Sequence, residues 1–180
     1  MKPFVQGLCA GALAAAGLPA LAADVGPYAA FGIGRTHYDA DCSIFFSCNG
    51  GRAGTGRLGG GYQFEVFALE GWIADWGRAP IGYADDHVRL RSIGGGGAWH
   101  WHMGTAVQGV GRVGFARVRQ TRTTENFSHT ELTLGLGLLV DVTPTVAFEL
   151  AWDATGSTGG SERIGTVVAQ AVTGGLRLRF

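Results

Sequence analysis

The alternation of apolar and charged residues in the last run of the chain most constrains its fold. In residues 172–180, Leu176, Leu178 and Phe180 share one face of a predicted strand, and Arg177 and Arg179 share the other. A soluble sandwich would turn the apolar face to a core, whereas a membrane barrel would turn it to lipid and the polar face to the lumen. Because the alternation continues to a terminal aromatic residue, it favours the barrel.

Seven further alternating runs precede this one and can supply its antiparallel partners. We expect strands at about residues 28–38, 53–64, 67–77, 87–101, 105–119, 131–141 and 146–153, followed by the last at 163–180. Each is close to the length that a tilted strand needs to cross a bilayer. The fourth contains four consecutive glycines at 94–97, which weaken a strand or mark a bend. The outward faces of the sixth and seventh predict lipid contacts for Leu134, Leu136, Leu138, Phe148 and Leu150.

The connections between these runs alternate in length. Long polar stretches, including 80–86, 120–129 and 155–160, follow the odd-numbered runs, and short turns at 65–66, 103–104 and 142–145 follow the even-numbered ones. Outer-membrane barrels have short periplasmic turns and longer outer loops. The pattern predicts an all-β fold, an eight-stranded antiparallel up-and-down transmembrane β-barrel. The alternative is a soluble secreted β-sandwich, in which the leucine stripe would pack against a second sheet.

The first residues have the form of a secretory signal peptide. Lys2 precedes an apolar run from Val5 to Ala22, and Ala20-Leu21-Ala22 fits a small-residue cleavage site. We expect residues 1–22 to be removed, with cleavage after Ala22 or Ala23, and residues 23–180 to form the barrel domain. The alternative is a single membrane anchor, for which the run is short.

The charge of the mature chain excludes one class of partner. Of the 14 basic residues, one is Lys2, so the mature chain carries 13 arginines against 14 acidic residues, a net charge of about −1. A chain that binds nucleic acid needs a basic excess, so we expect no nucleic-acid partner.

Cys42 and Cys48 remain after the signal peptide, in the stretch from Asp41 to Gly50, which loop-forming residues bound and which lies between the first two runs. A close, even pair in an exported protein predicts a local disulfide. The alternative is two free thiols or half of a metal site, and no nearby histidine completes a zinc set.

Several short segments together carry a family resemblance. They are the stretch from Asp41-Cys42 to Ser47-Cys48, Gly61-Tyr62-Gln63-Phe64, Ala68-Leu69-Glu70 with Gly77-Arg78, Thr143-Pro144, Phe148-Glu149-Leu150 and Arg179-Phe180. In this order and at barrel spacing, the mature chain resembles the OmpA-like outer-membrane β-barrels.

The resemblance implies an eight-stranded barrel in the bacterial outer membrane with a side-chain-filled interior. It also implies outer-membrane lipid and lipopolysaccharide as surroundings, and periplasmic chaperones and the barrel-assembly machinery as partners. The terminal strand with Leu176, Leu178 and Phe180 would be the sorting signal. Many relatives carry a peptidoglycan-binding domain after the barrel, and we expect none here because no residues follow Phe180.

Five charged residues fall on predicted lumen faces: Glu70, Arg112, Glu149, Arg177 and Arg179. Buried charges persist only when they are paired, and an eight-stranded barrel is just wide enough for side chains to fill it. We therefore expect a paired plug, with a gate that rearranges to pass ions as the alternative.

The sequence predicts a non-enzymatic barrel that supports the outer membrane and presents its loops outside. The alternative is a lipid A-modifying enzyme, because Ser128, His129 and Glu131 put a hydroxyl, an imidazole and a carboxylate close together in sequence. A triad needs a geometry set by the fold, and adjacent residues of a strand point to opposite faces. We expect no catalytic, cofactor or metal site, and we expect His100 and His102 to be solvated.

Overall fold

The computed structural model describes residues 25–42, 51–80, 87–121, 126–161 and 164–180. Eight strands cover them: β1 (Gly26–Cys42), β2 (Arg52–Phe64), β3 (Phe67–Pro80), β4 (His87–His102), β5 (Val107–Thr121), β6 (Asn126–Thr143), β7 (Val146–Ser161) and β8 (Ile164–Arg179). Among these residues, no helix has the length and apolar character needed to span a membrane. The expected signal peptide, residues 1–22, lies outside the described residues.

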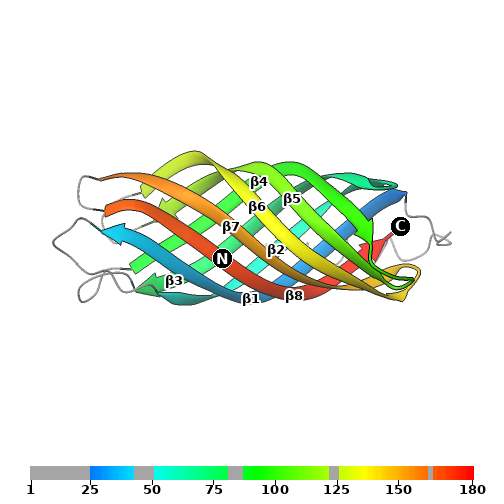
Figure 1. The fold of residues 1–180 in the computed structure, drawn as a ribbon. Coiled ribbons are helices and arrows are strands. Elements are labelled where there is room, and N and C mark those ends of the chain that lie inside the picture. Colours follow the sequence, from blue (N-terminus) through cyan, green and yellow to red (C-terminus); the bar gives the residue numbers. More distant parts are fainter. Residues whose placement is uncertain (1–24, 43–50, 81–86, 122–125, 162–163) are drawn as a thin grey trace, which may run out of the picture.

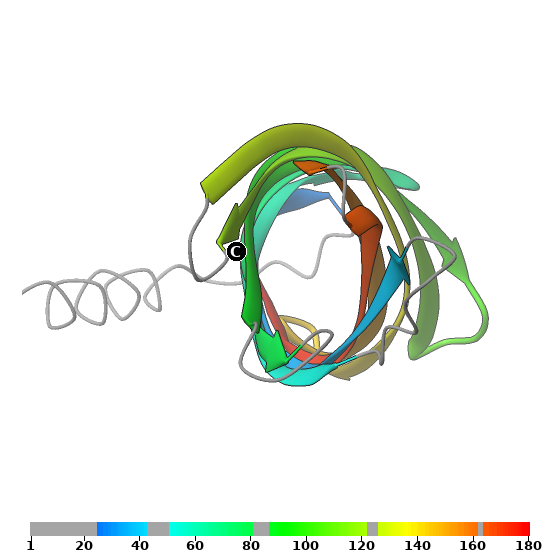
Figure 2. The same ribbon diagram turned by 90° about the vertical axis from the view of Figure 1, so that its left-hand side faces the viewer.

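The strands form one closed antiparallel barrel (Figure 1). Each strand pairs with its sequence neighbours, and β1 closes the ring on β8, from Tyr28 opposite Arg179 to Cys42 opposite Ile164. Figure 2 shows the ring nearly along its axis. The predicted eight-stranded up-and-down barrel is confirmed, and the soluble sandwich is not what this chain forms. The closed ring leaves no strand edge unpaired along its length.

The two ends of the barrel differ in their connections. The turn end carries residues 65–66, 103–106 and 144–145, and Phe180 there donates its backbone N–H to the carbonyl of Pro27. The loop end carries the connections that follow β1, β3, β5 and β7. Figure 1 shows the turn end on the right, together with the C-terminus.

Two predicted loops are wrong, because the strands extend farther toward the loop end. β6 begins at Asn126, opposite Thr121, so most of 120–129 is strand, and β7 continues through the predicted loop at 155–160 to Ser161. Polar and glycine-rich sequence predicts a loop, but cross-strand backbone pairing continues through it. The turn after β4 is also longer than predicted, since β5 begins only at Val107. Strands of 13–18 residues exceed the roughly 10 that cross a bilayer, so the wall projects beyond it.

The glycine run at 94–97 does not interrupt β4, which pairs with β3 and β5 throughout it. Close contacts around Gly96 of β4 and Gly114 of β5 explain why this part of the wall has glycines in place of larger residues. A Cβ on Gly114 would lie 2.6 Å from Cη2 of Trp72, and a Cβ on Gly96 would lie 2.2 Å from the carbonyl oxygen of Val113. Glycine therefore makes room for a lumen-filling indole and for close strand approach.

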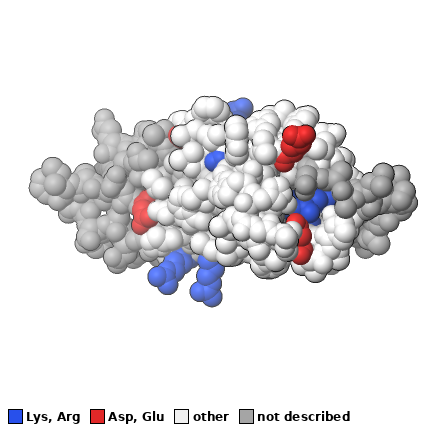
Figure 3. All heavy atoms as spheres, turned by 45° about the vertical axis from the view of Figure 1, so that its right-hand side comes forward, with Lys and Arg blue, Asp and Glu red and all other residues white. Residues whose placement is uncertain are grey.

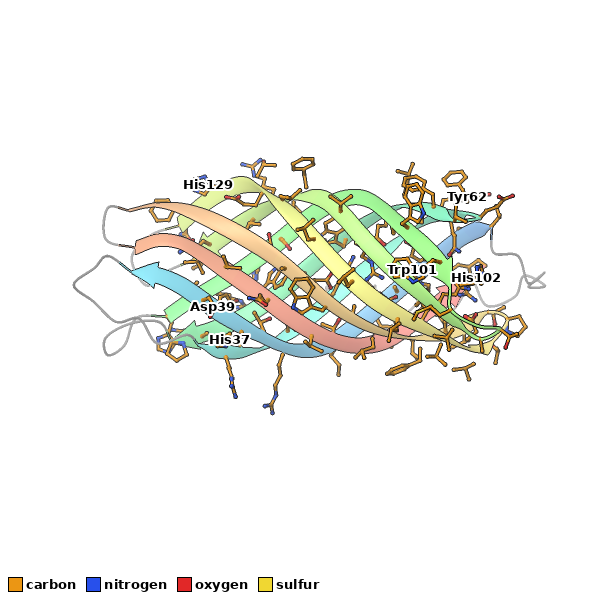
Figure 4. All side chains as sticks on the ribbon, viewed as in Figure 1. His37, Asp39, Tyr62, Trp101, His102 and His129 are labelled. Carbon is orange, nitrogen blue, oxygen red and sulfur yellow. The ribbon has the colours of Figure 1, made fainter. Side chains whose placement is uncertain are left out.

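The outer surface around the middle of the barrel is apolar. Leu134, Leu136, Leu138, Phe148 and Leu150 are exposed on it, as a lipid-facing band requires. Figure 3 shows one face, on which uncharged surface predominates and the charged side chains stand in a few separate places. Trp101 and Tyr62 lie at the turn end (Figure 4), where aromatic side chains suit the membrane interface.

The polarity of the wall inverts toward the loop end. On β5, outward Val113 and Phe115 are followed by outward Arg117 and Arg119, all exposed, while the inward positions change from buried Arg112 to small and apolar residues. Those apolar residues belong to an inward cluster that we call the loop-end core: Tyr38, Trp72, Trp76, Ala79, Val88, Leu90, Ala116, Val118, Val167, Ala169 and Ala171. Beyond the lipid band the barrel is thus built like a water-soluble one.

Candidate functional site

A layer of six charged side chains crosses the lumen on the turn-end side of the loop-end core. Its members form one chain of alternating charge that begins at Asp153 on β7 and ends at Arg177 on β8. We call it the charged layer; in order it contains Asp153, Arg57, Glu70, Arg112, Glu149 and Arg177. With three arginines and three carboxylates, it balances its own charge.

Short contacts connect each member of the layer to the next. Nη1 of Arg57 lies 2.8 Å from Oδ1 of Asp153, and its Nη2 lies 3.1 Å from Oε1 of Glu70. Nε of Arg112 lies 3.2 Å from Oε1 of Glu70, and its Nη2 contacts Glu149. Glu149 also accepts from Nε of Arg177 at 3.2 Å. The charges are therefore neutralised across strands on opposite sides of the ring.

Tyr28 of β1 contacts two members of the charged layer, Glu70 and Arg177. Its hydroxyl donates to Oε2 of Glu70 at 2.9 Å, and its ring lies 4.3 Å from the guanidinium carbon of Arg177. A cation over an aromatic face is stabilised by the ring quadrupole. The side chain of Arg177 is completely buried, so this ring and the Glu149 carboxylate replace the water that an exposed arginine would have.

Little free space remains around the charged layer. The cavity beside it, lined by Tyr28 and by Glu70, Arg112 and Arg177, measures ≈ 20 Å³, room for roughly one water. The loop-end core covers one side, and a smaller apolar cluster of Tyr28, Ala68, Ala98, Val110, Leu139 and Ala147 covers the other. The lumen is filled by side chains across three successive levels.

The structure brings four of the five predicted lumen charges together, namely Glu70, Arg112, Glu149 and Arg177. Arg179 lies apart, at the turn end, where its Nη2 is 2.8 Å from Oδ1 of Asp141. Sequence reasoning omitted Arg57 and Asp153 from the set. Both lie on the inward faces of their strands. The predicted set contained three arginines but only two glutamates, and this imbalance was a signal that a carboxylate was missing.

His100 is an exception to the prediction of solvated histidines. It faces the lumen, is 2 % exposed, and makes no hydrogen bond to any part of the chain that the structure describes. The prediction was wrong because the alternation placed it on the polar face, and that face is closed to water here. His102 is exposed, as predicted. The described ranges contain no group of three or more His, Cys, Asp or Glu side chains that could hold a metal ion.

Ser128, His129 and Glu131 do not converge. Ser128 is exposed on the outer face of β6, where its Oγ accepts a hydrogen bond from Nε of Arg117 at 3.0 Å. His129 is on the opposite face and stacks on Phe127, with ring centroids 6.5 Å apart. The hydroxyl and the imidazole are therefore separated by the barrel wall.

The proposed disulfide stays a prediction, because Cys48 lies outside the described residues. Cys42 ends β1 at the loop end, opposite Ile164. The pair would tie the connection after β1 to the rim of the barrel.

No protein-family model and no curated protein matches this chain, but solved structures do. Neisserial surface protein A has 18% identity and a TM-score of 0.61, covering 86% of this chain and 99% of its own. The outer-membrane protein OprG from Pseudomonas aeruginosa has 12% identity and a TM-score of 0.58, covering 89% and 99%. The outer-membrane protein AlkL, solved in lipid bilayers, has 14% identity and a TM-score of 0.53, covering 91% and 95%. The chain is therefore a closed eight-stranded barrel with the fold of bacterial outer-membrane barrels, the fold that its resemblance to OmpA-like barrels implied.

Proposed function

We propose that the protein is a non-enzymatic outer-membrane barrel that stabilises the membrane, presents its loops outside, and has a closed lumen. The observation that carries the proposal is the charged layer, which crosses the lumen with alternating, neutralised charges. A conducting pore would need solvated charges along a water-filled path. Here each charge faces a partner, and clusters of buried apolar side chains pack on both sides of the layer, which supports a closed lumen.

The same proposal includes a route to the membrane. Residues 1–22 would direct export and be removed after Ala22 or Ala23, and residues 23–180 would insert. The terminal strand, with Leu176, Leu178 and Phe180, would be recognised by periplasmic chaperones and by the barrel-assembly machinery. Outer-membrane lipid and lipopolysaccharide would surround the apolar band. Heat-modifiable gel migration of protein extracted from the membrane fraction tests whether a closed barrel reaches it.

Conduction is the measurement that tests the closed lumen. In planar bilayers we expect small, intermittent conductance from the unmutated protein. Glu149→Ala removes the carboxylate shared by Arg112 and Arg177, so it should admit water and raise the ion leak. Steady, large conductance from the unmutated protein would show that the lumen is open.

A control variant separates loss of the plug from loss of a carboxylate in general. Asp39 is an exposed acidic residue at the loop end, paired with His37 at 3.1 Å (Figure 4). Asp39→Ala removes one carboxylate outside the lumen and should leave the conductance of the barrel unchanged. Equal leakage from both variants would contradict the assignment of the charged layer as the plug.

The lipid A-modifying alternative has no geometric support. A serine nucleophile needs its base within hydrogen-bond reach, and Ser128 and His129 project to opposite faces of β6. Ser128 instead accepts a hydrogen bond from Arg117.

A further inference from the structure

Four arginines form a cluster on the outer wall where β4 and β5 leave the apolar band. Arg91 lies directly across from Arg119, Arg117 lies across from Ile93, and Arg89 lies two residues before Arg91 on the same face. We call Arg89, Arg91, Arg117 and Arg119 the arginine cluster. All four project away from the lumen, because the positions between them are buried inward residues.

The acidic residues nearby compensate only part of this charge. Asp75 of β3 pairs with Arg89 and lies 3.3 Å from Nε of Arg91. Arg117 donates to the neutral hydroxyl of Ser128, and within the described ranges neither it nor Arg119 pairs with a carboxylate. Like charges on directly opposed positions of two strands destabilise the pair. The cluster is thus an electrostatic cost to the barrel that a bound anion would remove.

The height of the cluster on the wall restricts what that anion can be. One step nearer to the turn end, the same outward faces carry exposed Ile93 and Phe115, and Leu132 begins the apolar stripe of β6. The guanidinium groups therefore lie at the level where acyl chains give way to headgroups. At the loop end, this level belongs to the outer leaflet.

The outer wall has two open grooves over β4, β5 and β6, one of which is lined by members of the arginine cluster. The first, ≈ 560 Å³, is lined by Arg91, Arg117, Arg119, Ile93, Phe127 and Ser128. The second, also ≈ 560 Å³, lies toward the turn end and is lined mainly by apolar residues, among them Gly97, Trp99, Gly111, Val113 and Leu136. Glycines on β4 and β5 hollow the wall there. Along β4, β5 and β6, a groove with arginines in its lining is thus followed toward the turn end by an apolar one.

We propose that this face binds a phosphorylated glycolipid of the outer leaflet, the lipid A part of lipopolysaccharide. Arginine forks bind phosphate oxygens bidentately, so Arg117 and Arg119 hold a phosphate in the first groove. The acyl chains lie in the second groove against Val113 and Leu136. The inference rests on the outer-membrane location proposed above, and it adds a defined lipid site to it.

The test measures lipid A binding to protein purified from membranes and reconstituted in phosphatidylcholine nanodiscs. The variant is Arg117→Gln/Arg119→Gln. The matched control is Arg35→Gln/Arg52→Gln, which removes two exposed outward arginines from β1 and β2, strands away from the grooves. We expect the first to weaken binding of diphosphorylated lipid A at least about tenfold, since it removes two charge-assisted contacts. The control should change it less than about twofold.

Ligand controls identify the chemistry that is recognised. Lipid A lacking its phosphates should bind the unmutated barrel as weakly as intact lipid A binds the Arg117→Gln/Arg119→Gln variant. Phosphatidylglycerol that binds as tightly as lipid A would overturn the assignment to a glycolipid. Arg91→Gln/Arg119→Gln provides a second variant, should the first fail to form a heat-modifiable barrel.

Failure of this inference is distinguishable from failure of the proposed function. If the unmutated protein forms no heat-modifiable barrel in membranes, the proposed function is wrong. If it forms the barrel, and the Arg117→Gln/Arg119→Gln variant binds lipid A as tightly as the Arg35→Gln/Arg52→Gln control does, only the glycolipid site is wrong.

Discussion

The part of the wall inside the apolar band and the part beyond it at the loop end are built from the same strands with opposite polarity. Inside the band, β6 turns Leu134 and Leu136 outward, while the lumen holds the charged layer. Beyond it, β4 turns Arg89 and Arg91 outward and buries Val88 and Leu90 inward. The outward face is thus apolar inside the band and cationic beyond it, while buried side chains pack inside the barrel at both levels.

This comparison teaches that alternation alone does not assign a face to lipid. The period-two pattern continues along β5 without a break, yet the apolar face changes sides between Phe115 and Arg117. Inside the band, charged side chains can be buried in the lumen without a large desolvation penalty only when they form a neutral, connected layer. At the loop end apolar packing fills the same lumen, as in a soluble core. The two regions should therefore respond differently to the same kind of substitution.

Glu149→Ala should have the largest effect on stability. It leaves Arg112 and Arg177 buried without their shared carboxylate, which costs about 3–5 kcal/mol in the free energy of unfolding. Urea unfolding in lipid vesicles, followed by tryptophan fluorescence, measures it. The exposed pair of Asp39 with His37 supplies the control, since Asp39→Ala should cost less than about 1 kcal/mol. Similar losses for both variants would contradict a buried charged layer.

Leu90→Ala tests the loop-end core as a soluble-type core. Leu90 is completely buried in the lumen, so truncation should cost about 2–5 kcal/mol through lost burial and the cavity left behind. Leu136→Ala removes the same atoms from the lipid face, where lipid chains fill the space, and should cost less. The same unfolding assay compares the two. The distinction between the regions would be lost if Leu90→Ala were the milder change.

Leu136→Arg locates the boundary of the lipid band. Leu136 is the middle residue of the outward stripe of β6, so an arginine there should cost about 2–4 kcal/mol. Thr130 lies on the same face of the same strand, beyond the apolar stripe, and Thr130→Arg should cost at most about 1 kcal/mol. A neutral result at Leu136 would count heavily against membrane insertion of this face.

Reduction of the predicted Cys42–Cys48 disulfide should have the smallest effect. The short separation limits the entropy that the link removes from the unfolded chain, so we expect a loss of about 2 kcal/mol. Mass spectrometry of the unreduced protein checks the bond itself, and two free thiols would eliminate the prediction. The loss should appear at the loop end first, as faster proteolysis of the connection after β1.

The sequence determined the strands and the two faces of each one, because side-chain direction in a strand follows a local period of two. It identified Glu70, Arg112, Glu149 and Arg177 as inward residues and Leu136 as an outward one. The glycine run of β4 predicts a weakened strand, yet the side chains before and after it still alternate between the two faces.

Only the tertiary structure decided which inward residues meet. The height of a side chain in the lumen depends on the register of every hairpin and on the closure of β1 against β8. Arg57 on β2 and Asp153 on β7 therefore become partners 96 residues apart, a pairing that no local pattern contains. The level of the lipid boundary has the same origin, since it separates Phe115 from Arg117 by position along the barrel axis. The local sequence pattern determines on which side of the wall a residue lies, whereas the register and closure of the ring determine which residues it contacts.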